Sequence, residues 1–192
     1  MKKVLSLLLA TVLCLSLCAC GGAVKLTAKE VESALADCKG TLNLETSGNN
    51  VIGFTYVVEG VNADDLVKKE YTREAIRTIL SGDTSKTTLG QVRVGKAISP
   101  LMSIDVLLGG DEKEFNSEAF IEKMLDIACD GDSVNYGDWT VYAVVSQKKD
   151  SITIVVGTED YEGWTGAEED TNPAPVPGGE YVVGPSNPEN AD

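Results

Sequence analysis

Histidine is absent from this chain of 192 residues, and cysteine occurs only five times. Without histidine the chain cannot form a Ser-His-Asp triad, a Cys-His catalytic pair or a zinc site with histidine ligands. These classes of enzyme and metal site are therefore excluded before any motif is considered.

Basic residues are also scarce. The chain has 16 Lys and Arg against 30 Asp and Glu, which gives a formal net charge of −14 at pH 7. A protein that binds nucleic acid needs a basic surface to neutralise the phosphates. We therefore expect no nucleic-acid partner.

The glycines and the paired carboxylates do not form a catalytic motif. Gly109-Gly110 precedes acidic residues instead of the Lys-Ser/Thr of a phosphate-binding loop. Asp64-Asp65 falls in the first turn of an expected helix, where acidic side chains suit the helix dipole, and Glu168-Glu169 falls in the polar C-terminal segment. The sequence predicts no catalytic residue and no cofactor, so an enzyme is the least favoured hypothesis.

Long apolar runs are missing except near the N-terminus. Lys2 and Lys3 precede an uncharged, leucine-rich stretch of 14 residues, 4–17. A transmembrane helix needs about 20 apolar residues, whereas the core of a signal peptide is shorter. The first residues are therefore predicted to form a signal peptide.

This stretch ends in Leu17-Cys18-Ala19-Cys20, followed by two glycines. The segment resembles the lipobox of bacterial lipoprotein precursors. The resemblance implies that residues 1–19 are removed and that Cys20 becomes a diacylglyceryl-modified N-terminus. Two acyl chains anchor a protein stably, so residues 20–26 would form a short tether at the extracytoplasmic face of the cell membrane. The alternative is an ordinary signal peptide cleaved after Ala19, which would release a soluble protein.

Removal of the leader and acylation of Cys20 leave Cys38 and Cys129 as the remaining thiols. Two thiols cannot make a zinc site of four cysteines. An even pair in an exported domain is compatible with a disulfide, but both residues lie at the ends of expected helices and nothing in the sequence brings them together. A disulfide and two separate buried thiols remain the alternatives.

The body of the chain, 27–158, alternates between helical and strand periodicity. Thr27 and Glu30 predict a capping box that begins a helix over 28–38, which Gly40 ends. Apolar and polar residues then alternate over 41–45 and 52–58, on either side of the turn residues 47–50. The first unit is therefore predicted to be a helix followed by a β-hairpin.

The middle unit is predicted to be a helix and two weaker strands. The helix runs from Asn62 towards Leu80, with Thr72 as an internal interruption. The strand segments are 89–94 and 101–108, and Ser99-Pro100 forms the turn between them, because proline does not fit a central strand.

The last unit repeats the pattern: Asn116 or Ser117 caps a helix that Gly131 ends, and strands over 139–145 and 152–156 flank a turn. Three helix-hairpin units predict an α+β fold, a single domain with a mainly antiparallel sheet and the helices packed on one face. Tyr142 and Val144 would point away from that face, towards a partner or a second layer of core.

Asp130, Asp132, Asn135 and Asp138 form the most metal-like run, since calcium prefers hard oxygen ligands. Their order does not follow an EF-hand loop, and helix-capping and turn chemistry explain the same residues. We predict no metal and keep this loop only as a weak calcium candidate.

Residues 159–192 differ from the body of the chain. They contain nine acidic residues, no basic residue and five of the six prolines, a composition typical of disorder. This tail is either a solvated extension or an interaction arm that uses Tyr161, Trp164 and Tyr181.

The leading hypothesis is a membrane-anchored interaction module. Its open sheet face or its tail would contact another protein of the cell envelope or a wall component. The alternative is a small-ligand-binding lipoprotein that serves a transporter or sensor, which would need a pocket of roughly several hundred Å³.

Overall fold

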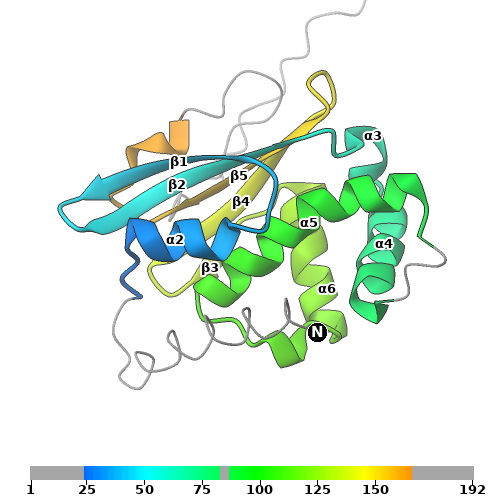
Figure 1. The fold of residues 1–192 in the computed structure, drawn as a ribbon, viewed down its shortest axis with the longest axis horizontal. Helices are drawn as coiled ribbons and strands as arrows, with labels where there is room; N and C mark the ends of the chain where they lie inside the picture. The colour runs from blue at the N-terminus through cyan, green and yellow to red at the C-terminus, as the bar shows by residue number, and fades with distance from the viewer. Residues whose placement is uncertain (1–23, 83–86, 166–192) are drawn as a thin grey trace, which may run out of the picture.

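The protein is described by a computed structural model over residues 24–82 and 87–165. A five-stranded antiparallel sheet lies against a layer of helices (Figure 1). The strands are β1 (Thr41–Ser47), β2 (Asn50–Glu59), β3 (Val134–Tyr136), β4 (Trp139–Ser146) and β5 (Ser151–Gly157). The helices are α2 (Ala28–Leu35), α3 (Ala63–Leu66), α4 (Lys69–Ser81), α5 (Leu89–Leu107) and α6 (Glu118–Leu125), with the short 3₁₀ helices η2 (Glu112–Glu114) and η4 (Glu162–Thr165) and the π-helical segment η3 (Asp126–Asp130). The predicted α+β class with a single domain is confirmed.

The strand order is β1-β2-β5-β4-β3, and every neighbouring pair is antiparallel. The two hairpins, β1-β2 and β4-β5, are therefore joined through their second strands. Strand β2 pairs with β5, and Tyr56 lies opposite Ile154 at the centre of the sheet. The side chains that face the helices form the main core together with α2, α5 and α6. The members of this core from the three central strands are Val51, Phe54, Tyr56, Val58, Trp139, Val141, Ala143, Ile152, Ile154 and Val156.

The predicted helix starts are confirmed at both helix-hairpin units, and so is the stop at Gly131, whereas α2 ends at Leu35, before the predicted end at Cys38. The Thr27 hydroxyl and the Glu30 carboxylate form the capping box of α2. Ser117 caps α6 through a hydrogen bond from the Phe120 amide, 3.1 Å long. Gly131 ends the turn after α6 with a φ of 72°, a conformation that suits glycine.

The two strands predicted over 89–94 and 101–108 are wrong, because both belong to helix α5. Thr88 and Gln91 form a capping box at its start. Pro100 lies inside the helix and cannot donate the usual backbone hydrogen bond. Val94, Ile98 and Leu101 are all buried against the core, so tertiary burial stabilises the helix in spite of the proline.

The single helix predicted from Asn62 to Leu80 is also wrong, since it is divided into α3 and α4. The break falls at Val67 and Lys68, and the Lys68 backbone is extended. Thr72, the expected interruption, lies inside α4 instead. Its buried hydroxyl donates to the Leu66 carbonyl over 2.7 Å, which satisfies an acceptor left at the end of α3.

The ordered chain continues past Thr158, the expected end of the domain. Tyr161 is only 6% exposed and packs with Tyr142 and Val155 in a second, smaller apolar cluster. The second apolar face of β4 is therefore another layer of core at this point, as one of the two alternatives predicted. The predicted tail from residue 166 onwards, including Tyr181, lies outside the described residues.

Candidate functional site

The face of the sheet that points away from the helices is the outer face (Figure 1). Alternate residues of each strand form it, and the strand register places them in rows. One row, which we call the Thr/Val row, crosses four strands and consists of Thr41, Val57, Thr153 and Val144. All four side chains are at least partly exposed and none is charged.

Tyr161 covers a different part of the outer face. Its ring lies on Gly53 and Gly157, which are paired across β2 and β5. A Cβ atom at either glycine would overlap the ring, so only glycine permits this close approach. The segment after β5 is thereby held on the sheet, beside the Thr/Val row.

The aromatic side chains of this cluster are neutral at ordinary pH. Burial, together with the neighbouring Tyr161, raises the pKa of Tyr142 to about 12. Burial and then the nearby Glu45 carboxylate raise the pKa of Tyr161 as well. The centre of the outer face therefore carries no charge in a chain whose net charge is −14.

A buried polar cluster ties α5, α6 and β3 together on the other side of the sheet. The Asp105 carboxylate is 1% exposed, and its Oδ1 accepts hydrogen bonds from Lys123 Nζ at 2.6 Å and from Tyr136 OH at 2.7 Å. Burial and the hydrogen bond to Asp105 raise the pKa of Tyr136. The phenol thus remains a donor to Asp105, and the cluster satisfies its own members as a structural unit requires.

Cys38 and Cys129 are both free thiols, and they contact different parts of the molecule. The Cys38 Sγ lies 3.9 Å from Ser103 Oγ. The Cys129 Sγ donates to the Leu66 carbonyl over 3.1 Å. Burial raises the pKa of both thiols, to about 11 for Cys129. These environments favour unreactive thiols rather than nucleophiles.

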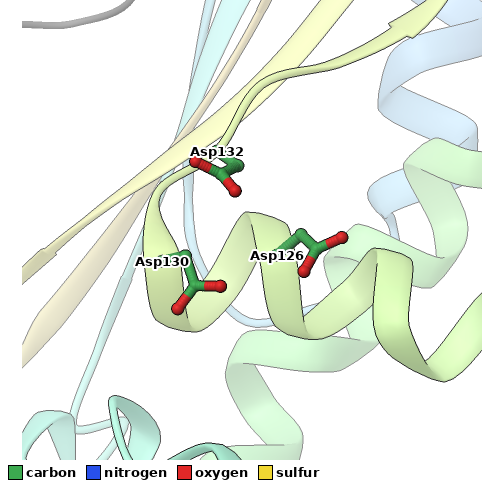
Figure 2. Close-up of side chains that lie close together, drawn as sticks. All are labelled: Asp126, Asp130 and Asp132. Carbon is green, nitrogen blue, oxygen red and sulfur yellow. The ribbon is translucent and has the colours of Figure 1, made fainter.

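The weak calcium candidate is divided by the structure. Asp130 and Asp132 lie near Asp126, with one carboxylate oxygen from each within 4.8 Å of the others (Figure 2). Asn135 lies in β3, where its Oδ1 accepts from Thr140 Oγ1 at 2.9 Å, and Asp138 lies in the turn between β3 and β4.

The three aspartates do not have the features of a built metal site. Asp130 is paired with Lys69, and Asp130 and Asp132 are exposed. Exposed acidic side chains that lie this close together are common in proteins without a bound ion. Asp126 was missed from the sequence because it lies one helical turn before the loop, and only its spacing of four residues from Asp130 could have indicated it.

Cys20 and the rest of the lipobox lie outside the described residues, as do residues 83–86. Within the part of the chain that the structure describes, no helix is both long and apolar enough to cross a membrane.

Comparisons with known proteins give no further guide to function. No family model, no curated protein and no solved structure matches this chain. The function is therefore argued from the residues and their geometry.

Proposed function

We propose that the protein is a lipoprotein anchored through Cys20 at the extracytoplasmic face of the cell membrane, and that its outer sheet face binds another protein of the cell envelope. The anchor is supported by the basic start, the apolar stretch 4–17 and the lipobox at 17–20. The binding role is supported by the Thr/Val row.

The Thr/Val row has the chemistry of the central part of a protein interface. It is uncharged across four strands, and charged residues are depleted at the centres of such interfaces. Valine and threonine are branched at Cβ and have few rotamers, so fixing them in a complex costs little side-chain entropy. The row therefore offers a preformed contact surface.

A protein partner fits this surface better than a small ligand. A small-molecule site encloses most of the surface of its ligand. The Thr/Val row instead spreads over four neighbouring strands, so it would contact a bound molecule from one side only. The shape therefore favours the interaction module over the ligand-binding alternative.

The anchor is tested by expressing the full precursor and a Cys20→Ser variant in a bacterial host and separating membranes from soluble material. We expect the unchanged protein in the membrane fraction, with the mass of a diacylglyceryl-modified Cys20 at its N-terminus. The variant should be recovered as soluble protein. Equal distribution of the two proteins would refute the anchor.

The binding surface is tested with a photo-reactive amino acid placed in the intact anchored protein. Val57 and Thr153 are the test positions in the Thr/Val row, and the exposed Lys113 in η2 is the control. We expect both test positions to cross-link to the same envelope protein in living cells, and the control not to. Cross-linking to wall fragments, or equal products from all three positions, would refute a protein partner at this face.

A further inference from the structure

Two large apolar side chains of the helix layer are strongly exposed. Leu89 is 70% exposed and Val92 is 48% exposed, and they lie one turn apart at the start of α5. Val67 is the other exposed large apolar residue of the described part, at 36%. An adjacent pair of exposed apolar residues on one helix indicates a contact surface.

Two cations lie on the same face of this helix. Arg93 and Lys96 follow Leu89 at positions i+4 and i+7, so the four side chains share one side of α5, which we call the α5 patch. The ion pairs of the described residues involve other cations: Lys68, Lys69, Arg73, Arg77 and Lys123. Asp105 is the sole acidic residue of α5, and it is buried. The α5 patch is therefore positive within a strongly acidic chain.

We infer that the α5 patch rests on the anionic bilayer to which the protein is anchored. Leucine and valine side chains that enter the lipid headgroup region, next to cations that bind lipid phosphates, are the arrangement by which helices lie on membranes. This inference rests on the proposed anchor for its place in the cell.

The small size of the patch fits a tethered protein. A stable protein interface buries about 800 Å² on each partner and needs about 20 to 30 residues, many more than the four residues of the α5 patch. An anchored protein needs less contact area, because a short tether gives its surface a high effective concentration at the bilayer.

The α5 patch and the outer face are separate surfaces of the molecule. Helix α5 lies in the layer on one side of the sheet, and the outer face lies on the other side (Figure 1). Contact of the α5 patch with the bilayer therefore does not occupy the Thr/Val row.

The test uses the mature chain, 20–192, with Cys20→Ser, so that no acyl chain contributes to binding. Sedimentation with vesicles of phosphatidylcholine alone is compared with sedimentation with equimolar phosphatidylcholine and phosphatidylglycerol. We expect binding to the anionic vesicles only, and weaker binding at higher salt.

The matched variants are R93E/K96E and K148E/K149E, which change the net charge equally. Lys148 and Lys149 are exposed in the turn between β4 and β5. We expect R93E/K96E to weaken binding by at least about tenfold, since each basic residue near an anionic surface contributes roughly fivefold. K148E/K149E should weaken it by less than about threefold, and L89S/V92S should weaken it without changing the charge.

Equal losses in the two charge variants, or no binding of the unchanged chain at millimolar lipid, would overturn the inference. Loss of a dimer in L89S/V92S, seen by light scattering, would instead identify a second copy as the occupant and overturn it too. All four patch residues are exposed, so the urea midpoints of the variants should stay unchanged. Failure of the Cys20 anchor would be detected independently of these vesicle experiments, by membrane fractionation of the full precursor and its Cys20→Ser variant.

Discussion

The contact of Tyr161 with the Gly53–Gly157 pair gives the sharpest prediction about the fold. The ring lies where a Cβ of Gly157 would be, so Gly157→Ala should push the ring off the sheet. Once Tyr161 is truncated to alanine the ring atoms are gone, and the methyl group meets only the Cβ of residue 161, 2.8 Å away, so a small shift of this segment is enough to fit it. The two substitutions should therefore be strongly non-additive.

The magnitudes follow from burial. Tyr161 is 6% exposed, and its truncation to alanine should cost about 3 kcal/mol, the lower end of the range for buried aromatic residues. Gly157→Ala should cost about 2 kcal/mol through overpacking. In the double variant the ring overlap is absent, and the remaining Cβ contact offsets the better fit of alanine in a strand, so the total should be about 3 kcal/mol rather than 5.

The assay is urea unfolding followed by tryptophan fluorescence, which comes from Trp139, 2% exposed in the core, and from Trp164. Thr153→Ala is the matched control, because it lies on the same face of β5 four residues from Gly157 and should add to Tyr161→Ala without coupling. A double variant whose loss equals the sum of the single losses would refute the Gly157–Tyr161 contact.

Three further predictions concern the buried groups and the C-terminal segment. Lys123→Met should cost about 3–5 kcal/mol, because it leaves the buried Asp105 carboxylate without its counter-ion. Asp105→Asn should cost less, because Lys123 is 29% exposed and can reach water. A larger loss of stability in Asp105→Asn than in Lys123→Met, measured by urea unfolding, would contradict this. Cys129, with its pKa raised from 9.0 to about 11, should react with iodoacetamide at pH 8 about 100-fold more slowly than an ordinary thiol. The free energy of unfolding should fall as the pH rises from 9 to 11, because the thiol ionises first in the unfolded chain. A reaction rate that levels off near pH 9 would contradict the raised pKa. A chain ending at Thr158 should be less stable than one ending at Thr165 by about the cost of Tyr161→Ala, about 3 kcal/mol, and equal thermal midpoints would show that the segment contributes nothing.

The sequence predicted the elements whose local signals agree with their surroundings. The capping box of Thr27 and Glu30, the Ser117 cap and the stop at Gly131 all rest on hydrogen bonds or backbone conformations set by neighbouring residues. The two β-hairpins were predicted because the face of each that packs on the helices is apolar, which places an apolar residue at every second position.

Helix α5 was missed because its local signals conflict. Pro100 and the two apolar segments on either side of it favour strands and a turn, and most of the helix is buried, so the apolar residues do not form a single stripe. The capping box of Thr88 and Gln91 was the signal that could have identified the helix. The spacing of Val94, Ile98 and Leu101 agrees with it.

The candidate sites also differ in how far the sequence predicts them. The lipobox is a linear recognition motif, so residues 17–20 are enough to predict an anchor, and that prediction stays open to the Cys20→Ser test. The outer face was expected from the alternation of the strands. Its rows were not, because the pairing of β2 with β5 joins segments far apart in the chain.

The sequence by itself thus determined the net charge and the absence of histidine chemistry, and it determined the local structure of the helix caps, the turns and the alternating hairpin strands. Tertiary structure alone decided that α5 continues as one helix through Pro100, that Gly53 and Gly157 meet beneath Tyr161, and that Asp105 is buried with Lys123 and Tyr136. The physical reason is that capping and alternation involve neighbours along the chain. Burial and strand register depend on contacts between distant residues, and these can outweigh local preference.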